Sequence, residues 1–131
     1  MAQPLDGLRE LLGGRLAAIL AREACGSGVM RLYLADGYWT AFEESAYELC
    51  RLCPDAQLLA VDVHTTPQPV VTASVAAGEL HKAVCGLGGG VISGVEAVYE
   101  VGRSARPNYR RWHNRVTAGL RALRRNKDTN K

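Results

Sequence analysis

The chain has 131 residues, of which 47% are hydrophobic, so the sequence predicts one folded domain with one core and not a disordered segment. No apolar run reaches the roughly 20 residues that a membrane-spanning helix needs, and residues 1–6 lack the basic and apolar regions of a secretory signal. We therefore expect a cytoplasmic protein that makes no membrane contact and whose four cysteines do not form a disulfide framework.

The formal net charge of +3 is unevenly distributed along the chain. Residues 1–101 contain 6 Lys or Arg and 12 Asp or Glu, whereas residues 102–131 contain 10 Lys or Arg and one acid, Asp128. A basic end of this kind indicates either an arm that binds nucleic acid or another acidic partner, or a solvated helix whose cations suit the helix dipole.

The N-terminal third predicts a helix, a strand and a tight turn. Residues 5–24 carry leucines and one isoleucine at helical spacing, and Gly13-Gly14 in the middle indicate either a bend or a close packing partner. Residues 29–34 are apolar except for Arg31, which favours a strand that is largely buried on both faces. Residues 35–37 (Ala-Asp-Gly) are typical of a turn.

A second helix is predicted directly after this turn. Thr40 is a candidate N-cap, and Glu43 lies three residues later, at the capping-box spacing. Apolar and small residues then recur at helical spacing as far as Leu49. Two large aromatic residues, Tyr38 and Trp39, would thus lie where a strand passes into a helix.

The rest of the chain is divided into elements by its proline and glycine residues. It predicts strands over 57–63 and 70–75, a helix over 76–85, a glycine loop over 86–90, strand material over 91–101 with Gly94 as a bulge or turn, and a last helix from Pro107 to about Arg125. The predicted buried stripe of this last helix consists of Trp112, Val116, Leu120 and Leu123. Residues 126–131 are predicted to be a disordered end.

Strands and helices alternate irregularly in this order of elements. The pattern predicts an α/β domain with a mixed sheet of four to five strands surrounded by helices, in which strands 57–63 and 70–75 are antiparallel neighbours. We expect the domain to span residues 1–106, followed by a basic helix and tail over 107–131.

Three patterns that often carry chemistry are weak here. Residues 86–90 (Gly-Leu-Gly-Gly-Gly) lack the Lys-Ser/Thr of a phosphate loop and precede a strand. Cys50 and Cys53 have C-x-x-C spacing, which leaves a zinc site, a redox pair or ordinary half-buried cysteines as interpretations. The three histidines are scattered. We expect no enzyme activity, no catalytic residues, no metal and no cofactor.

Two aromatic stretches have both a core and a binding interpretation. Tyr38 and Trp39 either pack together in the core, or one of them projects to stack on a flat partner such as a base. Residues 109–115 interleave aromatics with arginines, which suits phosphate contacts and stacking. The same stretch also suits an amphipathic helix that Trp112 anchors to the sheet.

The central stretch resembles the first domain of the MutS mismatch-repair proteins. In that family a strand ends in Gly-Asp-Phe-Tyr-Glu-(Leu/Ala)-Phe and is followed by an acidic helix; here residues 31–46 read RLYLADGYWTAFEESA. Residues 69–84 (PVVTASVAAGELHKAV) are similar to the family's later strand and short helix. The resemblance covers residues 25–101 and is strong only around Asp36-Gly37.

The resemblance implies a mixed sheet with helices around it and a role in contacting DNA. The family's first motif aromatic wedges into the duplex and stacks on a mismatched base, and Tyr38 occupies that position. The family's glutamate, which hydrogen-bonds the base, corresponds to Thr40, which has no carboxylate. The chain is too short to carry the family's clamp and ATPase domains.

Together these patterns predict a non-catalytic nucleic-acid-binding domain that binds DNA, including mismatched or distorted duplexes, and functions in DNA repair. The expected contact residues are Tyr38, Trp39, Thr40, Arg103, Arg106, Arg110, Arg111 and Arg115. The alternative is a protein-interaction module that kept the fold and lost the DNA role, because the 12 acids of residues 1–101 would repel phosphates. A basic helix on the same face as Tyr38 would favour DNA, and one on the opposite face would favour a protein partner or a role in solubility only.

Overall fold

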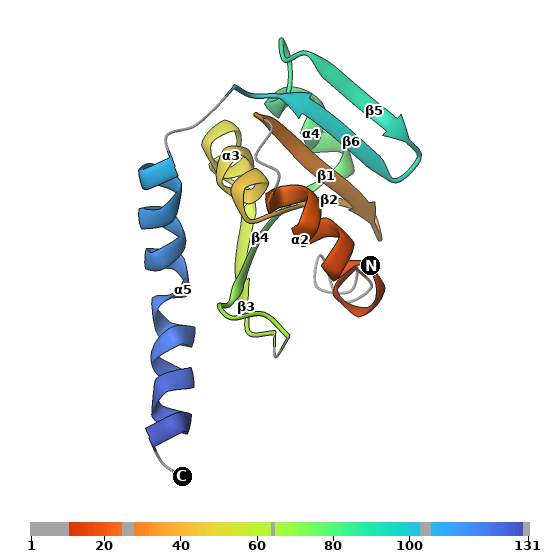
Figure 1. Ribbon diagram of the computed structural model, residues 1–131. Helices are drawn as coiled ribbons and strands as arrows, with labels where there is room; N and C mark the ends of the chain where they lie inside the picture. Colours follow the sequence, from red (N-terminus) through yellow and green to blue (C-terminus); the bar gives the residue numbers. More distant parts are fainter. Residues whose placement is uncertain (1–10, 25–27, 64, 103–105, 130–131) are drawn as a thin grey trace.

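Six strands form one sheet in the computed structural model, which describes residues 11–24, 28–63, 65–102 and 106–129 (Figure 1). The strand order is β3-β4-β2-β1-β6-β5, and every neighbouring pair is antiparallel. The strands are β1 (Val29–Ala35), β2 (Tyr38–Phe42), β3 (Gln57–Val61), β4 (Val70–Ala76), β5 (Gly89–Ser93) and β6 (Glu96–Glu100). The prediction of an α/β domain is confirmed, whereas the mixed sheet of four to five strands was wrong.

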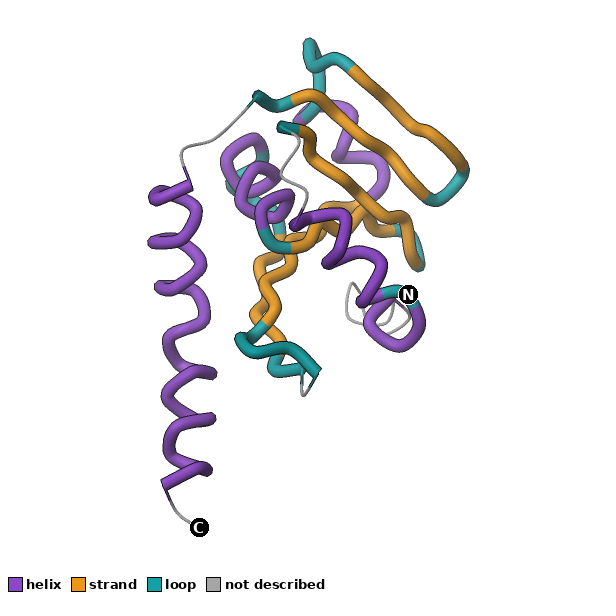
Figure 2. Tube along the Cα trace, viewed as in Figure 1, coloured by secondary structure: helices purple, strands orange, loops and turns teal. Residues whose placement is uncertain are grey.

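The additional strand is β2, where the sequence predicted a junction at Tyr38 and Trp39 and a helix starting at Thr40. Asp36 and Gly37 both have positive φ, 52° and 83°, and close a two-residue hairpin between β1 and β2 (Figure 2). Because the chain returns along β1 in this hairpin, Thr40 lies in the middle of a strand and is not an N-cap. Antiparallel pairing with β4 on the other side of β2 fixes the strand.

Four helices are fully described, and they are α2 (Leu16–Ala24), α3 (Glu44–Leu52), α4 (Ala77–Ala83) and α5 (Arg106–Thr129). Residues 11–14 are also helical, and the chain turns at Arg15 before α2. Among the described residues, no packing partner lies within 4 Å of a Cβ built on Gly13 or Gly14, and the helix is interrupted at Arg15, which favours the bend of the two interpretations. None of the described helices is long and apolar enough to cross a membrane.

The loop predicted at residues 86–90 is shorter in the structure, because β5 begins at Gly89. Gly89 and Gly90 belong to β5, and Ser93 pairs with Glu96 across the turn that contains Gly94. Gly89 has φ 100°, and a Cβ there would collide with the carbonyl oxygen of Val98. The split of residues 91–101 at Gly94 is therefore confirmed, and it produces the edge hairpin β5–β6.

The two faces of the sheet carry separate apolar clusters. One cluster faces α3, α4 and α5, and we call this side the α3 face; it includes Trp39 and Ala41 of β2 together with Leu49 and Leu80. The other side, the α2 face, carries Tyr33, Phe42, Leu16 and Ile19 among its buried residues. Successive residues of a strand point to opposite faces, so Tyr38 and Thr40 belong to the α2 face with Phe42.

Helix α5 lies against α3, β3 and β4, and its C-terminal half extends past the sheet (Figure 1). Trp112 and Val116 pack on the cluster of the α3 face, as the amphipathic interpretation expected. Leu123 is 57% exposed, which corrects the predicted stripe, because the helix has passed the body at that point. Among the described side chains of α5, His113 and Thr117 are the buried ones. The helix runs to Thr129, so a disordered end over 126–129 was wrong.

We predict that Thr40 and Ser74 are energetically coupled. Their hydroxyl oxygens lie 2.9 Å apart in the sheet interior, and the two side chains are 1% and 4% exposed. Thr40→Val removes one hydroxyl and leaves the other buried without this partner, which is expected to lower the free energy of unfolding by about 1–2 kcal/mol.

Urea unfolding of Thr40→Val, Ser74→Ala and the double variant measures this coupling. The free energy of unfolding is expected to fall clearly less in the double variant than the sum of the decreases in the two single variants. Strictly additive losses would contradict a hydrogen bond between the two hydroxyls.

Candidate functional site

The junction between β2 and α3 is strained at one residue. Glu43 has φ 54° and ψ −118°, a conformation that a residue with a Cβ rarely adopts and that costs on the order of 1–3 kcal/mol. Its backbone N–H continues the ladder by donating to the carbonyl of Val71 at 2.8 Å. The backbone then turns at once, and Tyr47 donates to the carbonyl of Glu43 at 3.0 Å in the first turn of α3.

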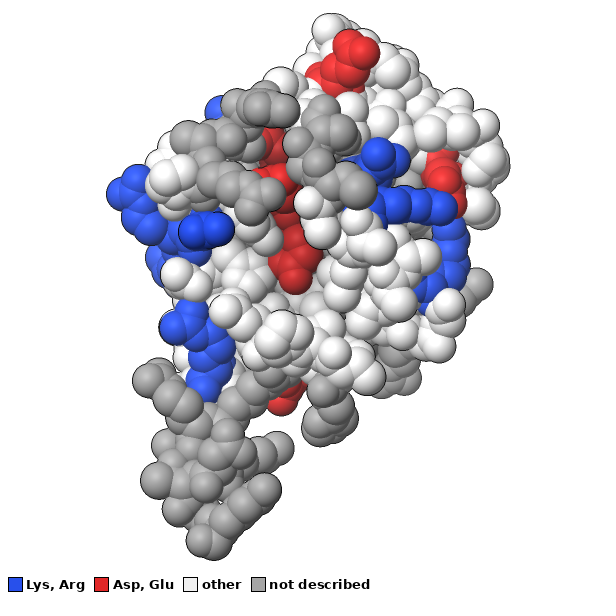
Figure 3. All heavy atoms as spheres, in the orientation of Figure 1, with Lys and Arg blue, Asp and Glu red and all other residues white. Residues whose placement is uncertain are grey.

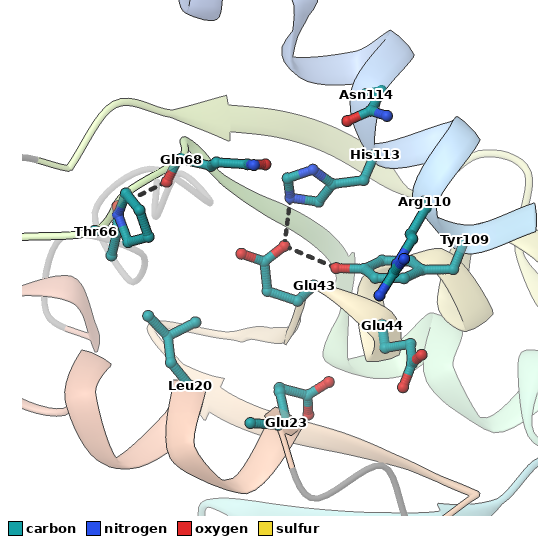
Figure 4. A pocket seen from close by; sticks show the side chains of 12 residues that line it. Leu20, Glu23, Glu43, Glu44, Thr66, Gln68, Tyr109, Arg110, His113 and Asn114 are labelled. Carbon is teal, nitrogen blue, oxygen red and sulfur yellow. Dashed lines mark hydrogen bonds and ion pairs between the residues drawn. The ribbon is translucent and has the colours of Figure 1, made fainter. Parts of the chain in front are cut away.

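The side chain of Glu43 joins this junction to α5. Its Oε2 accepts a hydrogen bond from His113 Nε2 at 2.7 Å and one from the Tyr109 hydroxyl at 3.1 Å (Figure 4). The two donors are four residues apart and therefore lie on one face of the helix. Burial, and then the Glu43 carboxylate, raise the pKa of Tyr109 far above its ordinary value, so the phenol stays protonated and donates.

Aromatic rings support this connection from the side of α3. The ring of Tyr47 lies 5.3 Å from that of Trp112 and 6.0 Å from that of Tyr109, both in edge-to-face orientation. Tyr109 also meets His113 edge to face at 5.7 Å. These rings pack the first turns of α3 and α5 together beside the Glu43 carboxylate.

A second carboxylate, that of Glu23 on α2, binds the N-terminus of α3. Its two oxygens accept from the Ser45 backbone N–H at 3.0 Å and the Ser45 hydroxyl at 2.8 Å. Glu23 thus accepts from one of the N–H groups in the first turn of α3 that have no partner within the helix. The N-cap residue itself, Glu43, makes no such side-chain hydrogen bond. Burial nevertheless raises the pKa of Glu23 to about 7, against the lowering effect of Ser45 and Arg31.

These groups line a pocket of about 650 Å³ between α2, the start of α3, the β3–β4 loop and α5 (Figure 4). Its lining residues are Leu20, Glu23, Ala24, Glu43, Glu44, Thr66, Pro67, Gln68, Tyr109, Arg110, His113 and Asn114. In the surface view, acidic side chains lie in the hollow beside α5 and basic side chains follow α5 itself (Figure 3). The acidic hollow and the basic helix are therefore neighbours.

The predicted contact residues occupy three different environments. Trp39 is 7% exposed in the α3-face cluster, and Thr40 is 1% exposed. Tyr38 is half-buried at the hairpin end of β2, on the face opposite α5. The structure thus brings neither Tyr38 nor Thr40 to the basic helix.

The predicted arginine contacts on α5, unlike Trp39 and Thr40, are exposed to solvent. Arg110, Arg111 and Arg115 are exposed on α5. Arg103 and the side chain of Arg106 lie outside the described part of the chain. The predicted contacts of α5 therefore form one group, and Tyr38 is separate from it.

Sequence reasoning missed the residues that converge on the pocket. Glu43 was interpreted as part of a capping box, and His113 as one of three scattered histidines. The only available signal was the four-residue spacing of Tyr109 and His113, which places them on one helix face. Nothing in the sequence indicated that this face meets Glu43, 66 residues from Tyr109.

The C-x-x-C cysteines lie away from this pocket. Cys50 and Cys53 are free, half-buried thiols at the end of α3, and burial raises the pKa of Cys50. Among the described residues, no group of three or more metal-ligating side chains is close enough to hold an ion.

Comparison of the chain with family models, with curated proteins and with solved structures gives no match. The resemblance to the first MutS domain therefore stays a prediction, and the geometry of the described residues carries the proposals below.

We predict that Glu23 makes stability depend on pH. A carboxyl whose pKa rises from 4.5 to about 7 on folding favours the folded state most at low pH, and this contribution is lost as pH rises through 7. At about 1.4 kcal/mol per pKa unit the loss amounts to at most about 3 kcal/mol. Other charges act on the group: Arg31 of β1 lowers its pKa, and Glu44 of α3 raises it.

Urea unfolding of wild type and Glu23→Gln at pH 5 and pH 8 tests this dependence. The variant keeps an acceptor for Ser45 but has no proton to lose, so its stability relative to wild type is expected to rise between the two pH values. A difference that stays constant would show that Glu23 titrates normally in the folded protein.

Proposed function

We propose that this protein is a non-catalytic nucleic-acid-binding domain whose phosphate contacts come from the outward face of α5. The observation that carries the proposal is the placement of the arginines on this helix. Arg111 and Arg115 are exposed and do not line the pocket, and Arg110 is exposed beside it. Tyr109 and His113 bind Glu43 and fix the helix to the body. A rigid helix with accessible cations is suited to an extended phosphate backbone.

The cations of the body and those of α5 differ in their partners. In the body, Arg15 and Arg22 bind Glu96, Arg51 binds Glu48, and Lys82 binds Glu79. On α5, Arg111 and Arg121 donate to the side chains of asparagines on the same helix, and no ion pair joins any described arginine of α5 to a described carboxylate. The described arginines of α5 thus keep their charge available to an acidic partner.

The mismatch-recognition role implied by the MutS resemblance depends on Tyr38 alone. Trp39 and Thr40 are buried, so a base can reach only Tyr38 without a rearrangement of the sheet. Because Tyr38 and α5 lie on opposite faces, we propose phosphate contact by α5 as the main mode of binding and stacking by Tyr38 as a separate one. Cytoplasmic DNA is the partner that we propose.

A protein-interaction module is the second candidate function. The position of Tyr38 opposite α5 favours it, and so does the acidic hollow beside α5, which would repel a nearby phosphate (Figure 3). This candidate predicts no DNA binding even at low salt.

We predict that DNA binding is salt-dependent and is weakened by loss of α5 arginines. Arg111→Gln and Arg115→Gln, singly and together, are each expected to weaken binding to every duplex alike and to reduce the slope of log affinity against log salt by about 1 per residue. Neither residue lines the pocket, so the acidic hollow is unchanged. Fluorescence anisotropy with labelled homoduplex, single-mismatch duplex and single-stranded DNA at several salt concentrations measures both effects.

Lys82→Gln is the matched control, because it removes one positive charge from the body and its side chain is 77% exposed. It is expected to change the slope little. An equal effect of Lys82→Gln would mean that net charge, and not α5, governs binding. Absence of binding at low salt would overturn the nucleic-acid proposal, and a mismatch preference that disappears in Tyr38→Ala would establish the stacking contact.

A further inference from the structure

We infer that the pocket between α2, α3 and α5 binds a small organic cation, that is, a guanidinium or ammonium group carried on an apolar stem. This inference does not depend on the proposed nucleic-acid binding. It rests on the charge of the pocket, on one carboxylate oxygen held in a fixed position, and on the apolar side chains in the lining.

The charge of the lining is negative on balance. Among the described residues, three carboxylates line the pocket, those of Glu23, Glu43 and Glu44, and Arg110 is the only arginine or lysine that does so. Carboxylates that share a hollow with low-dielectric walls attract a cation more strongly than exposed carboxylates do. An anionic ligand would meet this repulsion, whereas a cation would relieve it.

One carboxylate oxygen is positioned as an acceptor for such a cation. Among the described residues, His113 and Tyr109 donate to the Glu43 carboxylate, and both donate to Oε2. The other oxygen points away from these two donors, into the space between α2 and the β3–β4 loop (Figure 4). Two bonds on its neighbouring oxygen fix its position, so binding a ligand would cost little side-chain entropy.

The lining also includes apolar side chains. Leu20 and Ala24 of α2 and Pro67 of the β3–β4 loop line the pocket, next to Glu23 on the same helix and to Thr66 and Gln68 in the same loop. A ligand with an alkyl stem can bury the stem there while its charged end reaches Glu43. A volume of about 650 Å³ lies within the usual range for small-molecule pockets.

A bare metal ion fits the described residues less well than an organic cation. No group of three or more of these His, Cys, Asp and Glu side chains is arranged to hold an ion. The nearest nitrogen, His113 Nε2, already donates to Glu43 and so carries a proton. A planar guanidinium needs only two acceptor oxygens and tolerates the wider spacing.

The test is a titration followed by ¹⁵N–¹H NMR at pH 8, where Glu23 is ionised, with butylguanidine as the ligand and butylurea as its neutral analogue of the same shape. Butylguanidine is expected to shift the amides of 43–45, 66, 68 and 109–114 with a dissociation constant on the order of 1 mM. Butylurea is expected to bind at least about tenfold more weakly, because it has no charge.

Variants decide whether the pocket carboxylates are responsible. Glu43→Gln and Glu44→Gln are each expected to weaken butylguanidine binding severalfold. Glu44 makes no hydrogen bond to another described side chain, so its variant keeps the fold even if loss of the Glu43 charge loosens α5. Glu79→Gln, an exposed carboxylate on α4 outside the pocket, is the matched control and is expected to change nothing.

A titration with a second ligand, an acetylated and amidated Gly-Arg-Gly peptide, distinguishes the two possible sources of the cation. If the peptide produces the same shifts, the pocket accepts an arginine side chain of a protein; if only butylguanidine binds, it takes a free small molecule. Equal binding of butylurea and butylguanidine would overturn the inference. So would shifts that are insensitive to Glu44→Gln, or the absence of any saturable shift.

Discussion

The carboxylate of Glu43 is the constraint on which the rest of the structure depends. It belongs to a residue with a strained backbone, φ 54°, where the central strand β2 passes into α3, and it binds two side chains of α5. A strained conformation persists only where the surroundings over-determine it. Here the ladder bond to Val71, the first turn of α3 and the two donors on α5 do so together. One residue therefore connects the sheet, its covering helix and the basic helix.

Both proposals for this molecule follow from that connection. Because Tyr109 and His113 occupy the inward face of α5, Arg111 and Arg115 point outward and are free to meet an acidic partner. Because α5 and α2 both line the space around Glu43, a pocket with carboxylates in its lining forms between them. Arg111 and Arg115 lie outside this lining, whereas Arg110 belongs to it, and the acidic hollow and the basic helix lie side by side (Figure 3). The contact between Glu43 and α5 thus places a basic helix surface next to an acidic pocket.

The sequence predicted those elements whose signals are local. The strand 29–34, the antiparallel pair of 57–63 and 70–75, the turn at Gly94 and the last helix all follow from apolar runs bounded by glycine or proline. It failed at β2, because Tyr38 to Phe42 is apolar at alternate positions and also at helical ones, and only pairing with β4 decides between them. It failed at the pocket because Glu23, Glu43 and His113 are far apart in the chain. Their convergence depends on the packing of α2 and α5, which periodicity does not encode.

The central claim is that Glu43 holds α5 against the body, and native-state amide hydrogen exchange of wild type and Glu43→Gln tests it most directly. If the claim is correct, protection in residues 109–117 falls in the variant, while the amides of β1 and β2 keep theirs. Glu44→Gln, which removes a neighbouring carboxylate without a bond to α5, should leave α5 protected. Unchanged protection of α5 in Glu43→Gln would show that the aromatic contacts of Tyr47 and Trp112 alone hold the helix, and would contradict this account.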